Sequence, residues 1–502
     1  MLKMTGRSPS KSKKKADEAW KECQSKMEKA GCNNAAIAAF KASYDKLKSG
    51  ASPFIAEKDI KKAGSDRVPT YESIAAKTKV NEGLLSKVVV LKLNGGLGTG
   101  MGLDKAKSLL EVKNGETFLD FTAKQIVYMR KNLGQKVRFL LMNSFSTSDD
   151  TNTFFSEKYP ELHAEGLEFV QNKVPKLLQD SLKPATHKEN PSCEWCPPGH
   201  GDLYAALSGS GKLDELVASG IDYMFVSNSD NLGATLDPIL LTYFAESKMP
   251  FMMECAARTE ADKKGGHLCV RKADGQLILR ESAQCAEEDE KFFQDVSTHQ
   301  FFNTNNLWVH LPSLVAALKE NGGIVPLPMI KNGKTVNPKD GASAKVFQLE
   351  TAMGAAIESF PGAGAVCIPR SRFTPVKKCS DLMLLRSDAY IVAKDMTLGL
   401  NPACKGRAPV VDLDSKAYKM VAQYEMLCPR GAPSLVRCTK LKVKGAVRFT
   451  GPNVRIEGDF AVTNGDAEVK TLSPKRYTGE LDVTDWDDDT ADECTVFSCS
   501  IM

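Results

Sequence analysis

A run of glycines and lysines between residues 92 and 107 (KLNGGLGTGMGLDKAK) is the part of this sequence best suited to binding a phosphate. It follows an apolar stretch, residues 88–93, that is typical of a buried strand. We expect its glycines to take positive φ values and to bring backbone N–H groups close to an anion, while Lys107 adds a positive charge. The pattern predicts a phosphate-binding loop, with a plain tight turn as the alternative. The glycines are Gly95, Gly96, Gly98, Gly100 and Gly102.

The spacing of this loop excludes two common phosphate-binding motifs. The P-loop requires a lysine directly after its last glycine, and neither Lys105 nor Lys107 follows a glycine. The dinucleotide fingerprint GxGxxG is also absent from this window. We therefore expect a different class of nucleotide-handling loop.

Asp230 is the carboxylate that we expect to bind a metal ion. It follows the apolar segment 223–226, so its side chain would project from the carboxyl end of a strand. A carboxylate oxygen there suits Mg²⁺, which keeps several waters and binds substrate phosphates. Asn228 lies on the same face of the strand and is placed to hydrogen-bond a sugar hydroxyl or a phosphate. The alternative is that Asp230 caps a helix or stabilises a turn.

Lys377 lies in a loop, residues 369–382 (PRSRFTPVKKCSDL), whose backbone freedom is limited by Pro369 and Pro375. A lysine in such a loop is held at a defined place, where it can stabilise negative charge on a phosphate. The alternative is a solvated surface lysine, which is what we expect for its neighbour Lys378.

His200 stands between two glycines and after two prolines in the segment 197–202 (PPGHGD). This composition predicts a rigid bend that brings one imidazole close to a ligand. An imidazole held in this way can hydrogen-bond a ligand. If the ligand atom is a phosphate oxygen, no proton transfer is expected, because that oxygen is already ionised near neutral pH. A purely structural histidine is the alternative.

The elements that position these residues alternate between short apolar strands and helices from residue 87 to about residue 370. This alternation predicts an α/β fold with a Rossmann-like, mixed but mainly parallel sheet and helices on both faces. In such sheets ligands bind beyond the carboxyl ends of the strands, so we expect the residues above to converge there. The expected strands include residues 137–142, 222–230, 251–255 and 365–369, and one expected helix is 119–133.

The two ends of the chain have different patterns. After Leu400, Val and Phe recur about every six residues with Gly or Asn between them, which predicts a small left-handed parallel β-helix. Before the glycine loop, apolar residues at steps of three and four predict two amphipathic helices. These residues are Trp20, Cys23 and Met27 in the first helix and Ile37, Phe40, Tyr44 and Leu47 in the second.

Composition excludes several classes of protein. The net charge is +5, but residues 1–15 alone contain six basic and no acidic side chains. We interpret this segment as a disordered tail and not as a nucleic-acid site, since nucleic-acid-binding proteins carry such charge on a folded face. No segment approaches the roughly 18 apolar residues of a membrane span, and the first fifteen residues lack the apolar segment of a secretory signal, so we expect a cytoplasmic protein.

Cysteine usage fits a reducing compartment. We expect the fourteen cysteines to be thiols, mostly small buried hydrophobes. Cys193 and Cys196 form one CxxC pair, but no second pair completes a zinc site. The last four residues (CSIM) fit the C-a-a-X pattern, so a farnesyl group on Cys499 and an unmodified thiol are alternatives. A single lipid of this kind anchors a protein only weakly.

Five segments together resemble the UTP–glucose-1-phosphate uridylyltransferases, or UDP-glucose pyrophosphorylases. The resemblance is dense and collinear over residues 85–390 and weaker towards the C-terminus, where the family also has a β-helix. It implies formation of UDP-glucose and pyrophosphate from UTP and glucose-1-phosphate, in a reversible, Mg²⁺-dependent reaction. The segments are LNGGLGTGMG with Lys107, CEWCPPGHGD (193–202), FVSNSDNLGATLD (225–237), FFNTNNLW (301–308) and PRSRFTPVKKCSDL (369–382).

The resemblance also implies roles for individual residues. Lys377 and Lys107 are the expected catalytic residues, and Asp230 is the expected Mg²⁺ ligand. The expected UTP-binding residues are Leu93, Asn94, Gly95, Gly96, Lys107, Met142, Gln171, Gly199, Asp230 and Lys377. The residues expected to bind the sugar phosphate are Gly95, Gly96, His200, Asn228, Ser229, Asp230, Gly266, Glu281, Asn303 and Asn305.

Gln171 is the residue that the resemblance assigns to the uracil base. Its side chain offers both an amide oxygen and an amide nitrogen, beside backbone groups of Leu93 and Gly95. Met142 would form an adaptable apolar floor under the ring. From the residues alone, Gln171 would be an exposed turn residue and Met142 a core residue.

The group assigned to the hexose comprises Gly266, Glu281, Asn303 and Asn305. These are short hydrogen-bonding groups suited to sugar hydroxyls. The asparagines after Phe302 are also a good turn or helix-cap sequence, which is the alternative.

We divide the chain into a basic tail with a helical segment (residues 1–80), a catalytic nucleotidyltransferase domain (81–390) and a C-terminal β-helix domain with an acidic tail (391–502). Two other functions stay open: an enzyme for a different hexose-1-phosphate, and a catalytically inactive UDP-sugar-binding protein. The inactive protein would have lost Lys107, Asp230 or Lys377, and all three are present. The oligomeric state is open, with a homo-oligomer formed through the C-terminal domain as one alternative.

Overall fold

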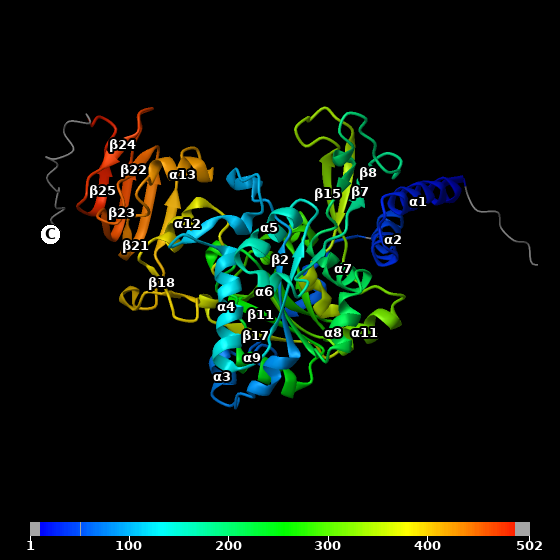
Figure 1. Cartoon of the computed structure of the whole chain (residues 1–502). Coiled ribbons are helices and arrows are strands. Elements are labelled where there is room, and N and C mark those ends of the chain that lie inside the picture. Colours follow the sequence, from blue (N-terminus) through cyan, green and yellow to red (C-terminus); the bar gives the residue numbers. More distant parts are fainter. Residues whose placement is uncertain (1–10, 51, 487–502) are drawn as a thin grey trace, which may run out of the picture.

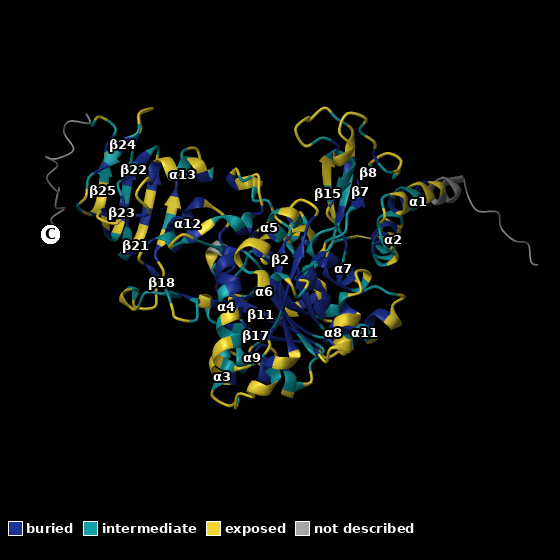
Figure 2. Cartoon of the chain, in the orientation of Figure 1, coloured by how far each residue is buried: buried dark blue, intermediate teal, exposed yellow. Residues whose placement is uncertain are grey.

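The computed structural model describes residues 11–50 and 52–486. A ten-stranded sheet lies at its centre, with the C-terminal strands on one side and the first two helices on another (Figure 1). The central strands are buried, whereas many loops and outer helix surfaces are exposed (Figure 2). The strands are β1 (Ile60–Lys62), β2 (Val88–Asn94), β5 (Arg138–Asn143), β6 (Glu168–Val170), β10 (Tyr223–Asn228), β11 (Phe251–Ala257), β12 (His267–Arg271), β13 (Leu277–Arg280), β14 (Phe301–His310) and β17 (Gly364–Ile368).

The sheet is mixed but mainly parallel, as predicted. Strands β10, β2, β5 and β6 pair in parallel in that order, and β11 pairs in parallel with β17. The long strand β14 lies antiparallel between β10 and β11, while β1, β12 and β13 add antiparallel pairs. The helices are α1 (Lys11–Lys29), α2 (Asn34–Lys48), α3 (Tyr71–Ala75), α4 (Phe118–Leu133), α5 (Ser148–Lys158), α6 (Pro160–His163), α7 (Leu203–Gly209), α8 (Lys212–Ala218), α9 (Pro238–Ser247), α10 (Glu290–Phe293), α11 (Leu311–Glu320), α12 (Cys379–Arg386) and α13 (Val421–Leu427).

Helices cover both faces of this sheet, and the residues of strand β2 illustrate this arrangement. All seven of its residues are buried. Val88 and Val90 pack with apolar residues of α4, α5 and α9, whereas Val89 and Leu91 pack with those of α7, α8 and α11. Because successive side chains of a strand point to opposite faces, a strand covered on both sides needs a continuous apolar sequence.

Helix α4 illustrates how local sequence sets the helix bounds. Thr117 and Asp120 form a capping box at its start, in which each side chain accepts a hydrogen bond from the other residue's backbone N–H. The helix ends at Leu133 and is followed by the C-cap residue Gly134, which takes φ +62°. The expected helix, residues 119–133, is therefore correct to within one residue.

The N-terminal helices α1 and α2 form the expected layer. Trp20 packs against Phe40 and Tyr44, with ring centroids 6.2 and 5.4 Å apart. The same cluster includes Val174 and Leu349, so the layer packs against the body of the protein. Helix α1 begins at Lys11, and residues 11–15 of the expected tail are therefore helical.

Several small sheets extend from the central one. Strands β15, β16 and β8 form one of them next to α1 and α2, where β7 and β9 pair as well (Figure 1). The bounds are β3 (Glu111–Lys113), β4 (Glu116–Thr117), β7 (Val174–Pro175), β8 (Leu177–Leu178), β9 (Trp195–Cys196), β15 (Ile330–Thr335), β16 (Lys345–Glu350), β18 (Tyr390–Val392) and β19 (Leu398–Leu400).

The C-terminal strands stack in parallel without intervening long helices. One parallel sheet has the order β20-β21-β23-β25, and β22 pairs in parallel with β24 in a second sheet. These strands repeat in chain order, which agrees with the periodic β pattern in the sequence. Their bounds are β20 (Val410–Leu413), β21 (Ser434–Lys444), β22 (Val447–Phe449), β23 (Arg455–Thr463), β24 (Lys470–Leu472) and β25 (Arg476–Asp482).

Two expectations about composition hold within residues 11–50 and 52–486. No helix there has the length and apolar character needed to cross a bilayer. All twelve cysteines of this part of the chain are free thiols. Cys499 and the first ten residues lie outside the described residues.

Candidate active site

Three of the predicted residues meet at one carboxylate. Asp230 follows β10, and its Oδ2 accepts hydrogen bonds from Lys107 Nζ at 2.6 Å and Lys377 Nζ at 2.9 Å. Lys107 lies in the 3₁₀ turn Lys107–Leu109, and Lys377 lies two residues before α12, next to the N-cap residue Lys378. The two ammonium groups leave one surplus positive charge after pairing with Asp230, which suits a polyanionic ligand.

The electrostatics of Asp230 result from two opposing effects. Burial raises the pKa of its carboxyl group, but the charges of Lys377 and Lys107 and the hydrogen bonds from them outweigh burial, so the pKa lies below its usual value. Asp230 is therefore ionised at neutral pH. Its other oxygen, Oδ1, is buried and has no hydrogen-bond partner among the described residues.

The glycine loop brings Lys107 back to its own start. The N–H of Lys107 donates to the carbonyl of Gly96 at 3.0 Å, which closes the loop. Of the five glycines in this loop, only Gly98 and Gly102 take positive φ values, +70° and +77°. The expectation that all five glycines would do so is wrong. Gly95 has a different constraint, since a Cβ there would lie 3.2 Å from Gln171 Oε1.

Gln171 joins two of the predicted base-binding segments. Its Oε1 lies against Gly95, and its Nε2 donates to the carbonyl of Gly199 at 2.8 Å. Gly199 has φ +78°, and a Cβ there would lie 2.5 Å from the carbonyl oxygen of Thr351. A side chain at this position would therefore clash with backbone.

Three other residues of the predicted UTP set lie at the ends of β2 and β5. Leu93 and Met142 are cross-strand partners in the core, and Met142 is 2% exposed. The side chain of Asn94 is also buried and donates to Asn143 Oδ1 at 2.7 Å and Thr151 Oγ1 at 2.9 Å. The amide of Asn94 therefore holds the two strands together, and its role in ligand binding stays a prediction.

His200 lies close enough to Lys377 to be affected by its charge, and a backbone contact fixes its ring. Its Nδ1 accepts a hydrogen bond from the N–H of Met353 at 3.0 Å. Burial, helped by the positive charge of Lys377, lowers the pKa of the imidazole to about 4. His200 is therefore neutral at pH 7 with its proton on Nε2, where it can donate to a ligand oxygen.

The four residues predicted for the hexose also come together. A Cβ on Gly266 would lie 2.4 Å from Glu281 Oε2, and the N–H of Asn303 donates to the carbonyl of Gly266 at 3.2 Å. Asn303 Nδ2 donates to Asn305 Oδ1 at 3.0 Å. Burial raises the pKa of Glu281, and a hydrogen bond with the Asn303 side chain opposes this effect.

The turn-or-cap alternative for these asparagines is wrong, because they lie within β14. Asn305 has φ +61°, and the register of β11 against β14 shifts between Glu254 and Cys255. This bulge explains why a strand contains an Asn-rich segment.

Asn228 and Ser229 end the strand that carries Asp230. Asn228 is the last residue of β10, and the N–H of Ser229 donates to the carbonyl of Leu93 at 3.1 Å. Both side chains are partly exposed. They lie beside the glycine loop, at the carboxyl edge of the sheet.

Four buried polar residues near Asp230 were not found from the sequence: Lys92, Asn231, Glu254 and Arg372. Lys92 Nζ donates to Ser227 Oγ at 2.8 Å and to the Ala234 carbonyl at 2.6 Å. Burial lowers the pKa of Lys92 to about 7. A charged residue inside an otherwise apolar strand is a usable signal, because burying an unpaired charge is costly. Lys92 in VVVLKLN and Glu254 in FMMECAA both carry that signal.

No cluster of three His, Cys, Asp or Glu side chains in the described part of the chain could hold a metal ion by itself. The site nevertheless combines backbone N–H groups, two lysines and one carboxylate at the carboxyl edge of a mainly parallel sheet. This arrangement defines an α/β protein that binds phosphorylated ligands.

Comparison with known proteins agrees with this class. A family model described as UTP–glucose-1-phosphate uridylyltransferase matches residues 37–457. The UTP–glucose-1-phosphate uridylyltransferase of Saccharomyces cerevisiae is 41% identical over 408 residues, 81% of this chain and 80% of the yeast protein. That of Solanum tuberosum is 41% identical over 399 residues, 79% of this chain and 80% of the potato protein.

Solved structures give the same result. A mutant UDP-glucose pyrophosphorylase from Leishmania major, in complex with UDP-glucose, has a TM-score of 0.86 and 48% identity, covering 92% of this chain and 98% of that one. A Trypanosoma brucei structure described as UDP-glucose phosphorylase has a TM-score of 0.84 and 46% identity, covering 93% and 100%. The chain belongs to the UTP–glucose-1-phosphate uridylyltransferase family.

Proposed function

We propose that this chain transfers the uridylyl group of UTP to glucose-1-phosphate, forming UDP-glucose and pyrophosphate in a reversible reaction. The observation that carries the proposal is the convergence of Lys107 and Lys377 on Asp230 Oδ2, at 2.6 and 2.9 Å. Membership of the family supports the choice of substrates, and the UDP-glucose complex of the Leishmania major relative supports the product.

In the reaction, a phosphate oxygen of the sugar phosphate attacks the α-phosphorus of UTP. The bond from that phosphorus to the β-phosphate oxygen breaks, and pyrophosphate leaves. No covalent intermediate with the protein is needed, so positioning and neutralisation of charge account for the catalysis. Lys377 stabilises the charge that develops on the α-phosphate, and Lys107 with the backbone of Gly95 and Gly96 holds the phosphates of UTP.

We propose Mg²⁺ as the cofactor, held by Asp230. The residues present fit this ion, because the buried oxygen Oδ1 lacks a hydrogen-bond partner among the described residues while Oδ2 binds both lysines. A single protein carboxylate is sufficient, since Mg²⁺ takes its other ligands from water and substrate phosphates. When bound, the ion neutralises negative charge on the phosphate oxygens.

Uracil binding is proposed for Gln171, with backbone groups of Leu93 and Gly95 beside it, while Gly199 lets the base lie against the backbone. What supports this is that the Gln171 side chain lies between Gly95 and Gly199. Met142, the cross-strand partner of Leu93, is proposed to form the apolar floor under the uracil ring. An amide side chain of this kind can satisfy a donor and an acceptor of the base at once.

Binding of the sugar phosphate is proposed for His200, Asn228 and Ser229, together with the hexose group Gly266, Glu281, Asn303 and Asn305. The contacts among Gly266, Glu281 and Asn303 support a shared subsite. The neutral His200 donates from Nε2 to a phosphate oxygen, since its Nδ1 already accepts from Met353.

Other features remain proposals about the whole chain. We propose a cytoplasmic location, and a left-handed β-helix for the parallel C-terminal strands, whose order β20-β21-β23-β25 supports a solenoid. The three-part division at residues 80 and 390, oligomerisation through the C-terminal part and a lipid on Cys499 are also kept as proposals. Intact mass of the protein from its native cells decides the last of these.

The experiment that tests the proposed function is pyrophosphate release from UTP across a panel of sugar-1-phosphates. We expect glucose-1-phosphate to give the highest kcat/KM. Equal or higher values with galactose-1-phosphate or N-acetylglucosamine-1-phosphate would assign the enzyme to another sugar. No release with any of them, together with binding of UDP-glucose, would identify an inactive UDP-sugar-binding protein.

A further inference from the structure

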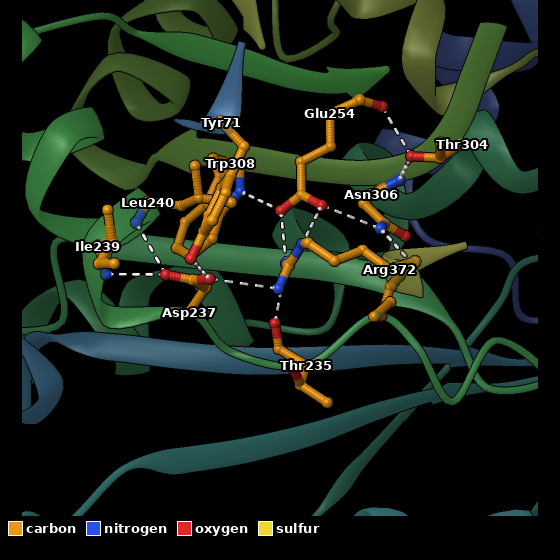
Figure 3. Close-up of polar contacts among 12 residues, drawn as sticks. Tyr71, Thr235, Asp237, Ile239, Leu240, Glu254, Thr304, Asn306, Trp308 and Arg372 are labelled. Atoms are coloured by element: carbon orange, nitrogen blue, oxygen red, sulfur yellow. Dashed lines mark hydrogen bonds and ion pairs between the residues drawn. The ribbon is translucent and has the colours of Figure 1, made fainter. Parts of the chain in front are cut away.

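Glu254 lies at the centre of a buried network of polar side chains that includes Arg372, Asn306 and Trp308 (Figure 3). This residue of β11 is 0% exposed, and its two carboxylate oxygens accept four hydrogen bonds. Arg372 donates from Nη2 to Oε1 at 2.8 Å and from Nε to Oε2 at 3.0 Å. Trp308 Nε1 donates to Oε1 at 2.9 Å, and Asn306 Nδ2 donates to Oε2 at 3.0 Å.

Arg372 connects Glu254 to the loop that follows β10. Its Nη2 also donates to the carbonyl of Thr235 at 3.0 Å, and its Nη1 lies 3.5 Å from Asp237 Oδ2 (Figure 3). Asp237 in turn caps α9 and accepts a hydrogen bond from Tyr71 Oη at 2.9 Å. Burial lowers the pKa of Arg372, but Glu254 and Asp237 outweigh burial, so the guanidinium stays charged.

Asn231, in the loop after β10, binds the loop that carries both Arg372 and Lys377. Its Nδ2 donates to Asn306 Oδ1 and to the carbonyl of Arg372, both at 3.3 Å. Its Oδ1 accepts from the N–H of Thr374 at 2.9 Å. The N–H of Val376 then donates to the carbonyl of Asp230 at 3.1 Å.

The two loops are therefore joined at successive residues. Residues 230–231 and 375–376 lie side by side, with a bridge between Asn231 and Pro375. The loops also approach closely at Gly233, where a Cβ would lie 2.4 Å from the carbonyl oxygen of Ser371. Nothing larger than glycine fits between them without a shift of backbone.

The side chain of Lys377 does not fix its own position. It is 57% exposed, whereas the side chains of Lys107 and Asp230 are 14% and 11% exposed. An exposed lysine retains its rotamer freedom, so the position of its ammonium group depends on where the backbone holds its Cα.

We propose that Glu254, Arg372 and Asn231 are positioning residues, which set the distance between Asp230 and Lys377 in the uridylyl transfer. The proposal rests on the proposed function. A buried ion pair is weak evidence of added stability by itself, but a fully hydrogen-bonded one can specify a single arrangement of the segments that it joins. Here the joined segments carry a metal ligand and a catalytic lysine.

The test is a double-mutant cycle between Asn231→Ala and Lys377→Ala, read as kcat for pyrophosphate release. If Asn231 acts through Lys377, Asn231→Ala lowers kcat at least about tenfold in the parent enzyme but less than about threefold in the Lys377→Ala enzyme. A merely structural role reduces the folded fraction and lowers kcat equally in both backgrounds. Equal effects would overturn the proposal.

Glu254→Gln supplies a second, independent arm. It keeps the size of the side chain but removes the closer of the two carboxylates that pair with Arg372, and we expect kcat to fall while KM for UTP changes less. The matched control is Glu165→Gln, which breaks the ion pair of Glu165 with Arg130 at 2.7 Å, away from the site. The control should lower the melting temperature without changing kcat.

The outcomes separate the two proposals. A parent enzyme that releases no pyrophosphate contradicts the proposed function. An active parent whose Asn231→Ala and Glu254→Gln variants keep their kcat contradicts the positioning role alone. If Glu254→Gln does not fold, the Asn231 cycle still decides the question.

Discussion

At the scale of single residues, the two oxygens of Asp230 have different surroundings. Oδ2 accepts hydrogen bonds from two lysines, and Oδ1 has no partner among the described residues. The hydrogen bond from the largely buried Lys107 orients the carboxylate, so Oδ1 is held in one direction. One side chain can therefore organise the cationic groups and serve as a metal ligand.

Lys377→Ala should lower kcat about 10²- to 10³-fold, as loss of one preorganised group at a developing charge does. Because this interaction is strongest in the transition state, the dissociation constant for UTP should change far less. Coupled pyrophosphate-release kinetics and equilibrium UTP binding measure the two quantities. Lys378→Ala, on the exposed neighbour, is the control and should leave both nearly unchanged. Unchanged turnover in Lys377→Ala would refute the catalytic role.

Asp230→Asn should raise the Mg²⁺ concentration needed for half-maximal activity at least about tenfold, because a neutral amide oxygen is a weaker ligand than a carboxylate. Titration of Mg²⁺ at fixed UTP gives this value. The Mg²⁺-dependent shift in melting temperature in the presence of UTP provides a second readout and should shrink in the variant. A variant with the metal dependence of the parent would rule out ligation by Asp230.

His200→Gln should change the pH dependence of stability. The pKa of His200 is lowered from 6.5 to about 4 in the folded protein, so its contribution to stability is fully present above about pH 6.5 and is lost as the pH falls towards 4. Each pKa unit corresponds to about 1.4 kcal/mol, so the loss reaches about 3 kcal/mol. Denaturant unfolding of both proteins between pH 7 and pH 4 measures it. Parallel curves for parent and variant would contradict this assignment.

At the scale of elements, the site is built where loops leave the carboxyl ends of neighbouring strands. The loop after β10 carries Asp230, the loop after β2 ends at Lys107, and the loop after β17 carries Lys377. Their spacing depends on close backbone contacts, of which that between Gly233 and Ser371 is one. The strands fix where the loops start, and contacts between loops fix where their side chains end.

Gly233→Ala tests whether close contacts between the loops set the positions of their side chains. The added Cβ would lie 2.4 Å from the Ser371 carbonyl oxygen and 2.9 Å from the Arg372 carbonyl carbon, so the loops must separate. We expect a loss of about 1–3 kcal/mol in the free energy of unfolding, as for other overpacked sites, and a lower kcat. Gly100→Ala is the control, because nothing lies within 4 Å of a Cβ there. Equal stability of the two variants in denaturant would contradict the expectation.

At the scale of the whole molecule, the expected boundary at residue 390 passes through a shared apolar core. One cluster contains Met101 of the glycine loop, Val376 beside Lys377, and Tyr418 and Leu441 of the C-terminal part. The C-terminal strands therefore pack against the two loops that carry Lys107 and Lys377. We expect the two parts to unfold together.

Leu441→Ala should reveal this coupling, because Leu441 is 0% exposed in the C-terminal strands. Removing such a side chain costs about 2–5 kcal/mol. Scanning calorimetry should show one transition at a lower temperature, and loss of activity on heating should shift by the same amount. Two separate transitions, with the temperature of activity loss unchanged, would show that the parts are independent.

Much of the fold could be predicted from local pattern. The apolar run of β2, the capping box of α4 and the apolar stripes of α1 and α2 depend on neighbouring residues in the chain, so sequence spacing reveals them. The asparagines of β14 were harder to interpret. Their strand contains a bulge at Asn305, and a bulge depends on the partner strand.

The candidate site was predicted in part, because local sequence patterns also indicate where its residues stand. Lys107, Asp230, Lys377, Gln171 and His200 stand in segments whose composition indicates strand ends and rigid bends, and the family resemblance supplied their expected roles. Positive φ was assigned to five glycines, although only Gly98 and Gly102 need it. Glycine is permitted in many conformations, and its presence alone does not say which one the chain adopts.

The sequence by itself determined the class of fold, the strand ends that carry the site and the chemical types gathered there, because these follow from short-range patterns. Only the tertiary structure decided which groups meet. Asp230 is separated from Lys107 by 123 residues and from Lys377 by 147, yet both lysines bind one of its oxygens. Likewise, Glu254 is paired with Arg372 across 118 residues. Charged side chains can be buried only where a partner is present, and in this chain the partners come from strands and loops far apart in sequence.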